Sequence, residues 1–177
     1  MHRFRYTSEC MNRRKIYNPE AMKILAAFTL IFAGYTSLFA QTEFLKPDGL
    51  APAHGYTHVV VAKPGKLVFL AGQVANNVQG QLVGKGDLKA QTEQVFENIK
   101  IALASAGATF DDVDKITFYV KGYKPDDLPA LREVRDRYVN KSAPPASTLV
   151  GVSSLFLDDY LIEVDATAVV PEKRAKK

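Results

Sequence analysis

The sequence predicts an α+β domain, in which two helices cover one face of a mixed β-sheet in the order β-β-α-β-α-β-β. Three observations support this prediction. Short segments rich in valine and aromatic residues are bounded by turn residues, which is typical of strands. Two longer segments repeat apolar residues every three to four positions, which is typical of amphipathic helices. Finally, 47% of the 177 residues are hydrophobic and 24% are charged, as in an ordinary globular domain.

The first two strands are expected at Thr57–Ala62 and Lys66–Gly72. Both segments are rich in β-branched or aromatic side chains. Pro64 and Gly65 lie between them and suit a tight turn. The sequence therefore predicts that these two strands form a hairpin.

The two helices are expected at Asp87–Ala106 and Asp126–Val139. Asp87 is a suitable N-cap for the first helix, and Gly107 is a suitable stop. Pro129 is compatible with the second helix because it falls in the first turn. The apolar stripes that would face the sheet are Leu88, Val95, Ile99, Ala102 and Ala106 in the first helix, and Leu128, Leu131, Val134 and Tyr138 in the second.

Three further strands complete the predicted sheet. Residues 114–122 alternate apolar with polar side chains. Pro144 and Pro145 end the preceding segment, and a strand follows as far as Val152. The last strand, Tyr160–Val170, has one apolar face and one mixed face. The mixed face consists of Leu161, Glu163, Asp165, Thr167 and Val169. This mixture indicates burial against partner subunits.

The first 40 residues have the order of an export signal. Lys23 precedes an uncharged apolar run that ends in small residues before Gln41. We therefore expect an N-terminal extension and signal peptide over 1–40 (the signal at about Met22–Ala40), the domain over 41–170 and a basic tail over 171–177. The start codon is either Met1 or Met22. Cleavage would give a periplasmic or secreted protein, and the alternative is an uncleaved membrane anchor.

The composition of the expected mature chain argues against several kinds of chemistry and partner. Cys10, the single cysteine, lies in the extension, so neither a disulfide nor a thiol nucleophile is expected. Six basic and two acidic residues precede Gln41, which leaves 17 of each sign from there onward. This balance argues against nucleic acid as a partner. His54 and His58 do not converge as metal ligands, and no cofactor motif is evident, so we expect neither a metal nor a cofactor.

Six segments of the domain come in the order and at the spacing of a known family. They are HGYTHVV, LVFLAGQV, AQTEQVFENIKIALASAGA, VDKITFYVKG, PPASTLVGVSSL and LIEVDATAVV, between about Gly49 and Val170. They resemble the RidA family (YjgF/YER057c/UK114), whose older names include endoribonuclease L-PSP. The resemblance implies a chorismate-mutase-like fold and a homotrimer with three clefts between subunits. It also implies hydrolysis of 2-enamine and 2-imine intermediates to 2-keto acids and ammonia.

The implied site departs from the family at one position. The family motif Pro-Ala-Arg-Ser matches Pro145, Ala146, Ser147 and Thr148, so Ser147 stands where an arginine is implied to hold the substrate carboxylate. A guanidinium binds a carboxylate with two hydrogen bonds, whereas serine offers one neutral donor. Ser147 and Thr148 are therefore candidate substrate-binding residues that have lost the carboxylate clamp.

No other arginine is expected to replace this one. Arg132, Arg135 and Arg137 lie on the second helix, and the sequence indicates that none reaches the start of the strand at Ser147. Lys121, at the end of the middle strand, is a candidate cation. We therefore expect weak deamination of 2-imino acids.

The other implied site positions match the family. Tyr56 aligns with a tyrosine that lines the cleft, and Gly72 and Gln73 align with a Gly-Gln step that binds substrate. Glu163 aligns with a catalytic glutamate that holds a water or shuttles a proton. Each side chain also has a structural alternative: a half-buried aromatic for Tyr56, a bond to loop backbone for Gln73 and a paired carboxylate for Glu163.

These residues support three hypotheses of function. The first is a small-molecule-binding trimer with hydrolytic enamine/imine deaminase activity on an unidentified substrate. The second is a non-catalytic trimer whose clefts bind a small molecule or a partner. The third, an endoribonuclease, rests on the family name alone, and a net-neutral domain without a basic aromatic patch does not favour it.

Overall fold

The computed structural model describes residues 42–172. The expected signal peptide, Cys10 and the tail from Lys173 lie outside these residues. Within them, no helix is long and apolar enough to cross a membrane. The helices and strands are β1 (Glu43–Leu45), β2 (Val59–Val61), β3 (Gly65–Gln73), α2 (Leu88–Ser105), β4 (Val113–Lys121), α3 (Leu128–Arg135), β5 (Ala146–Val152) and β6 (Ile162–Pro171).

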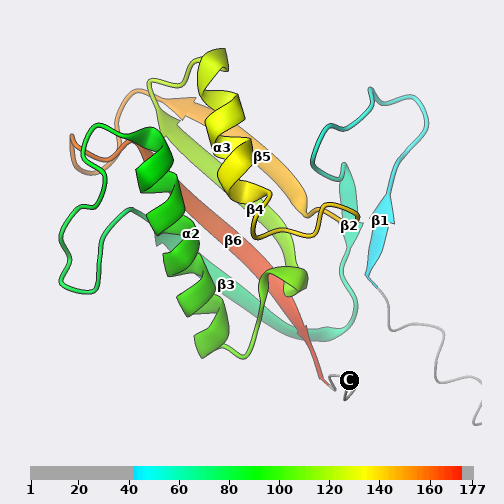
Figure 1. The fold of residues 1–177 in the computed structure, drawn as a ribbon. Helices are drawn as coiled ribbons and strands as arrows, with labels where there is room; N and C mark the ends of the chain where they lie inside the picture. The colour runs from blue at the N-terminus through cyan, green and yellow to red at the C-terminus, as the bar shows by residue number, and fades with distance from the viewer. Residues whose placement is uncertain (1–41, 173–177) are drawn as a thin grey trace, which may run out of the picture. The chain divides into compact units, whose positions relative to one another are not determined.

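Four of the strands form one mixed sheet in the order β3-β6-β4-β5 (Figure 1). β6 runs antiparallel to both β3 and β4. β4 and β5 run parallel, which requires a crossover connection, and α3 provides it. The expected fold class is confirmed, and it leaves β3 and β5 as the two edges of the sheet.

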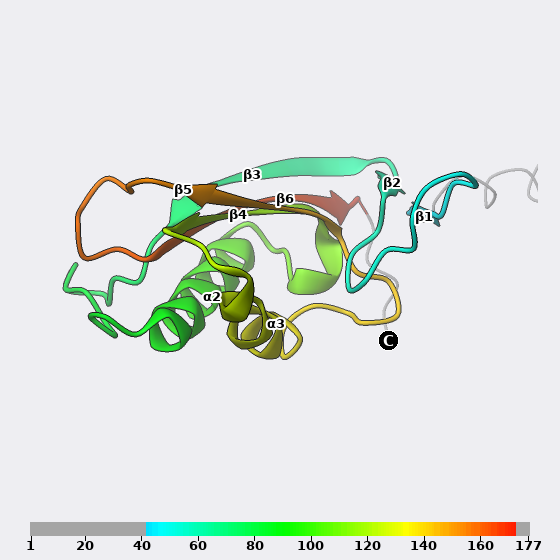
Figure 2. The same ribbon diagram turned by 90° about the horizontal axis from the view of Figure 1, so that it is seen from above.

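Both helices cover the same face of this sheet (Figure 2). The amide of Ala90 donates a hydrogen bond of 3.0 Å to the Asp87 side chain, which caps α2 as expected. Gly107, just beyond α2, has a φ of 75°, a left-handed conformation that glycine adopts easily. The apolar side chains larger than alanine that fill the space between helices and sheet with no exposure are Val95, Phe96, Ile99, Leu103, Ile116, Val120, Val134, Ile162 and Val164.

The hairpin expected around Pro64 and Gly65 is wrong. β2 pairs with β1, a strand that the sequence analysis missed, in a separate two-stranded sheet. β3 pairs with β6 instead. The favoured two-residue hairpin turns need a positive φ at one or both central residues. Proline has a fixed negative φ, and Gly65 is not among the positive-φ glycines of the described chain.

The second helix is shorter than expected. It begins at Leu128, after a 3₁₀ turn at Pro125–Asp127, and Pro129 lies in its first turn as expected. Beyond Arg135, backbone N–H groups donate to the carbonyl three residues earlier. The Tyr138 N–H, for example, donates a hydrogen bond to the Arg135 carbonyl. Such bonds tighten the chain into turns and end the α-helix before Val139.

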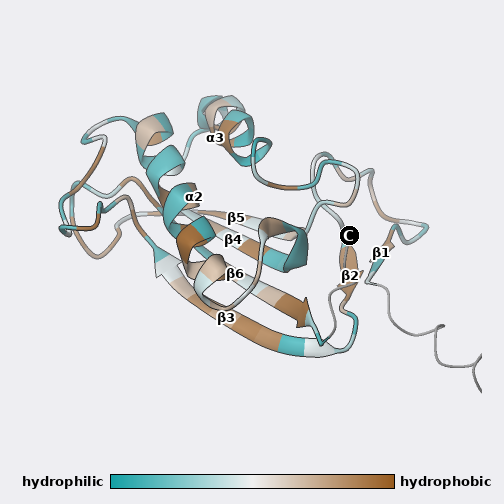
Figure 3. Ribbon diagram, turned by 60° about the horizontal axis from the view of Figure 1, so that its bottom comes forward, coloured by the Kyte–Doolittle hydropathy of each residue, from teal (hydrophilic) through white to brown (hydrophobic). Residues whose placement is uncertain are grey.

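The face of the sheet away from the helices, here called the open face, is mixed in character. β3 carries long apolar segments (Figure 3). On the open face, Phe69 is 74% exposed and Leu67 is 52% exposed. The neighbouring strand β6 adds Glu163 and Asp165 to the same face, since its buried residues alternate with them. Large exposed aromatic side chains on a flat sheet indicate a surface that another molecule covers.

Candidate functional site

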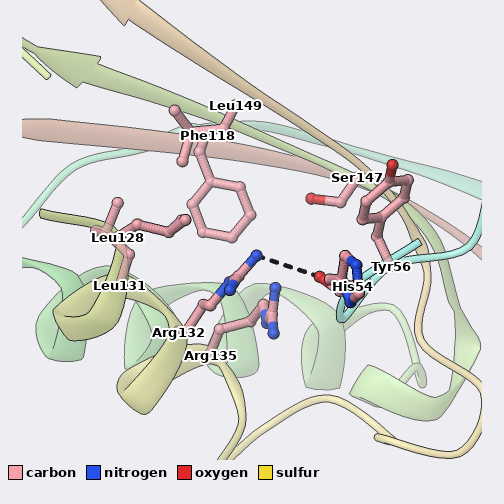
Figure 4. Close-up of a pocket in the computed structure, with 9 residues that line it drawn as sticks. All are labelled: His54, Tyr56, Phe118, Leu128, Leu131, Arg132, Arg135, Ser147 and Leu149. Atoms are coloured by element: carbon pink, nitrogen blue, oxygen red, sulfur yellow. Dashed lines mark hydrogen bonds between the residues drawn. The ribbon is translucent and has the colours of Figure 1, made fainter. Parts of the chain in front are cut away.

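A cavity of about 180 Å³ lies between the sheet and α3. Its lining residues are His54, Tyr56, Phe118, Leu128, Leu131, Arg132, Arg135, Ser147 and Leu149. Figure 4 shows that the Ser147 hydroxyl points into this cavity, while the two arginines enter it from α3. The structure therefore brings together two of the candidate residues, Tyr56 and Ser147.

Thr57 holds Tyr56 beside the start of β5. The Thr57 amide donates a hydrogen bond of 3.2 Å to the Pro145 carbonyl. The Thr57 hydroxyl donates another, of 2.6 Å, to the Pro144 carbonyl. The two prolines lack N–H groups, but their carbonyls still accept bonds and fasten the loop of Tyr56 next to Ser147.

The two arginines in the cavity correct the sequence analysis. Leu128, Leu131, Arg132 and Arg135 have the spacing i, i+3, i+4 and i+7, so they share one face of α3. That face packs toward the sheet, and its long side chains extend to the cavity that Ser147 lines. The sequence contains this signal, because the two arginines repeat with the helical spacing of Leu128 and Leu131.

The two guanidinium groups differ in their partners. Arg135 donates two hydrogen bonds, of 2.9 and 2.6 Å, to one carboxylate oxygen of Asp136, and its side chain is only 12% exposed. Arg132 donates one long bond of 3.3 Å to the backbone carbonyl of His54. Within residues 42–172, no carboxylate pairs with Arg132. The cavity therefore contains one neutralised and one unneutralised guanidinium.

Gly72 and Glu163 meet elsewhere, in a hollow on the open face. The hollow is lined by Gly72, Tyr119, Val152, Ser154, Leu155, Phe156, Glu163 and Asp165. A side chain at position 72 would collide with the Glu163 carboxylate, so glycine is needed for this close approach. No hydrogen bond joins the Glu163 carboxylate to another group in the described part of the chain.

Tyr119 is a second polar group in this hollow, and it lies opposite Glu163 in the pairing of β4 with β6. Its hydroxyl donates a hydrogen bond of 3.1 Å to Asp165. This bond, together with the negative charges of Asp165 and Glu163, raises the pKa of the Tyr119 hydroxyl. Tyr119 therefore stays protonated at neutral pH, and its one hydroxyl proton is directed at Asp165.

Three other candidate residues from the sequence line neither the cavity nor the hollow. Gln73 donates a hydrogen bond of 3.0 Å to the Ala71 carbonyl, which is the backbone role that was its alternative. The Thr148 hydroxyl faces away from the cavity and accepts a bond from Lys115. Lys121 binds the Asp158 carbonyl at 2.7 Å and pairs with Val152, at the far end of β5 from Ser147.

The candidate residues of one chain therefore form two groups on opposite faces of the sheet. Tyr56 and Ser147 belong to the cavity on the helix side, and Gly72 and Glu163 belong to the hollow on the open face. Among the residues described, no cluster of three His, Cys, Asp or Glu side chains is arranged to hold a metal ion. The chemistry that these groups offer is hydrogen bonding, anion binding and proton transfer.

Comparison with known proteins places this arrangement in a family. A family model described as Endoribonuclease L-PSP matches residues 47–170. A RutC family protein of Pyrococcus abyssi is 42% identical over 106 residues, which are 60% of this chain and 80% of that protein. The 3-aminoacrylate deaminase RutC of Acinetobacter baylyi is 30% identical over 128 residues, which are 72% of this chain and 98% of that protein.

Solved structures agree with the sequence relatives. The crystal structure of a Rid family protein of unknown function from Yersinia pestis has a TM-score of 0.66 and 36% identity, and covers 73% of this chain and 98% of that one. The span matched by the family model includes every residue that lines the cavity and the hollow. The chain therefore belongs to the Endoribonuclease L-PSP family, which is also named the RidA or YjgF family.

Proposed function

We propose that the protein is a hydrolytic deaminase of small enamines or imines, acting in clefts between the subunits of a homotrimer. The observation that carries this proposal is the Glu163 carboxylate, which has no hydrogen-bond partner among the described residues and lies against Gly72. A carboxylate in this setting can accept a proton from water. One relative bears the name 3-aminoacrylate deaminase, and its named substrate is an enamine acid.

In the proposed reaction, water attacks the carbon of the C=N bond. Glu163 accepts a proton from this water as the new C–O bond forms. This proton passes to the nitrogen, which gives a carbinolamine. The nitrogen then takes the proton of the new hydroxyl, the C–N bond breaks as the C=O bond forms, and ammonia and the carbonyl product are released. An enamine substrate first gains a proton on carbon and loses one from nitrogen, which gives the imine. The Tyr119 hydroxyl donates its one proton to Asp165, so its oxygen is left to accept a hydrogen bond from the attacking water.

The separation of the two groups of residues supports the proposed assembly. A substrate that contacts both Ser147 and Glu163 cannot do so within one chain, because these side chains lie on opposite faces of the sheet. Ser147 is the second residue of the edge strand β5, and Gly72 lies near the end of the other edge strand, β3. Edge strands are open to a neighbouring subunit, so a cavity of one subunit can face the hollow of the next.

The alternative is a non-catalytic trimer that binds a small molecule in the same clefts. No feature of the described residues favours this alternative over hydrolysis. Weak activity on 2-imino acids, expected because Ser147 replaces arginine, also stays a prediction. One assay tests both whether the protein is catalytic and whether its activity on 2-imino acids is weak.

The assay generates 2-iminobutanoate and 2-iminopropanoate in situ with an amino-acid oxidase and follows formation of the keto acid. Purified protein should accelerate hydrolysis above the buffer rate, while heat-inactivated protein should not. Light scattering on the same sample should give a mass near three chains. A native trimer that accelerates hydrolysis of neither imine nor of 3-aminoacrylate would contradict the proposed activity.

A further inference from the structure

Arg132 is an unneutralised cation in a cavity that is otherwise mainly apolar. The other two arginines of this region have acidic partners: Arg135 pairs with Asp136, and Arg137 pairs with Glu93, both at 2.6 Å. Arg132 engages only the His54 carbonyl among the described residues, at 3.3 Å. A guanidinium has five N–H donors, so most of those on Arg132 are left for a ligand.

The walls of the cavity strengthen the attraction of this cation for an anion. Phe118 and Leu149 come from the neighbouring strands β4 and β5, and Leu128 and Leu131 come from α3. Apolar walls exclude water and lower the local dielectric constant, which strengthens an ion pair. A planar guanidinium favours a carboxylate, because the two groups match in a pair of parallel hydrogen bonds.

The volume limits the size of the anion. The cavity of about 180 Å³ is slightly larger than the apolar cavities of ~150 Å³ that bind benzene. It therefore fits a molecule of about six to eight non-hydrogen atoms. A short aliphatic carboxylate with one further polar group has this size.

The second polar group of such a ligand has a partner on the other side of the cavity. Figure 4 shows Arg132 rising from α3 and the Ser147 hydroxyl pointing inward from the sheet. A hydroxyl both donates and accepts hydrogen bonds, so it suits a carbonyl oxygen as well as an imine nitrogen. The small side chain of Ser147 also leaves the space that an arginine at this position would fill.

We propose that Arg132 binds the carboxylate of the ligand, so that α3 supplies the guanidinium that β5 lacks. The ligand is then a short 2-oxo or 2-imino carboxylate, held by Arg132 at one end and facing Ser147 at the other. This assignment rests on the proposed function for the identity of the ligand. The carboxylate site itself rests only on the charge, walls and volume of the cavity.

Calorimetric titration with 2-oxobutanoate, a stable keto acid, tests the assignment without any turnover. Arg132→Gln should weaken binding about ten- to hundredfold, because it removes the charge and the paired donors. The matched control is Arg137→Gln, in the turn just after α3, where the arginine pairs with Glu93 of α2 and does not line the cavity. This control should bind 2-oxobutanoate as the wild type does.

Two further measurements separate a carboxylate contact from a general structural effect. Arg132→Lys retains the charge without the planar fork, so it should restore part of the lost affinity. 2-Oxobutanamide, a neutral analogue, should bind the wild type and Arg132→Gln equally. Circular dichroism melting curves of all variants verify that the fold is intact.

The outcomes distinguish this assignment from the proposed deaminase activity. Wild-type binding of 2-oxobutanoate that Arg132→Gln leaves unchanged would overturn the assignment, whether or not imines are hydrolysed. Wild-type protein that fails to bind 2-oxobutanoate at millimolar concentration would also overturn it. Binding that depends on Arg132 without any hydrolysis would support the assignment and contradict the deaminase proposal.

Discussion

The two faces of the four-stranded sheet differ in how one chain completes them. On the helix face, α2 and α3 bury Phe96 and Val164 with no exposure, and the cavity lies within the packed layer. On the open face, Phe69 is 74% exposed and the carboxylates of Glu163 and Asp165 border a hollow. One face is therefore a finished core, and the other is a surface that lacks its second layer.

This difference explains why the candidate site is divided. A sheet can be stable with one covered face, so the chain folds around the helix face alone. The open face then stays available for contacts with further subunits. Arg132 and Ser147, proposed for ligand binding, belong to the helix face, whereas Glu163, proposed for proton transfer, belongs to the open face. Substitutions on each face therefore test the two contributions separately.

The largest effect is expected on the helix face, at Phe96. This ring has no exposure and lies near Phe110, Phe118 and Tyr138, with ring centroids 5.1–6.1 Å apart. Phe96→Ala should lower the free energy of unfolding by about 3–5 kcal/mol, because it leaves a large cavity. Urea denaturation measures this change. Ile101→Ala, on the same helix but 67% exposed, is the control and should change stability by less than about 0.5 kcal/mol.

On the open face, Gly72→Ala should impair catalysis with little effect on stability. The new methyl group collides with the Glu163 carboxylate, which is the movable end of a flexible side chain. We expect the carboxylate to shift and kcat for imine hydrolysis to fall about a hundredfold. Glu163→Gln should cause a similar loss, and the double variant should be no worse than either single one. Full activity of Gly72→Ala would show that this carboxylate needs no fixed position.

A smaller effect is expected for Phe69, which tests whether another subunit covers the open face. Phe69→Ser should change the stability of the isolated chain by less than about 0.5 kcal/mol, because the ring is mostly exposed. It should nevertheless increase the dissociation constant of the proposed trimer about tenfold or more, because it would remove an apolar contact between subunits. Analytical ultracentrifugation over a range of concentrations measures this constant. An unchanged constant would exclude Phe69 from the subunit contact.

The smallest effect concerns Asp114, at the irregularity near the start of β4. One of its carboxylate oxygens is buried without a hydrogen bond in the described residues, and burial raises the pKa of this group above its ordinary value of 3.8. A raised pKa in the folded state means that the folded chain holds this proton more tightly than the unfolded chain does. The contribution of Asp114 to the free energy of unfolding is therefore greatest below pH 3.8, and it is lost as the pH rises through the raised pKa.

Asp114→Asn removes this titration. At pH 7 the variant should be more stable than the wild type by up to about 1 kcal/mol, because the group is only partly shielded from solvent. At pH 3.5 the two proteins should differ much less. Urea denaturation at both values measures the difference, and Asp126→Asn is an exposed control. An equal gain in stability at both values would contradict the titration as its cause.

The sequence by itself determined the secondary structure and the sheet faces where local periodicity is strong. The alternation in β6 separates Ile162 and Val164 from Glu163 and Asp165, and the structure confirms this separation. Asp87 and Gly107 were sufficient to place the ends of α2. These features depend on hydrogen bonds and dihedral angles within a few residues, so a single sequence contains the information.

Only the tertiary structure decided which segments lie side by side. Pairing of β2 with β1 rather than β3, and the approach of Tyr56 to Ser147 through Thr57, join residues far apart in the chain. The arginines of α3 enter the cavity because the crossover from β4 to β5 lays that helix against the sheet. Periodicity shows that Arg132 shares a helix face with Leu131, but not which strand that face meets, because contacts of long range depend on the packing of the whole domain.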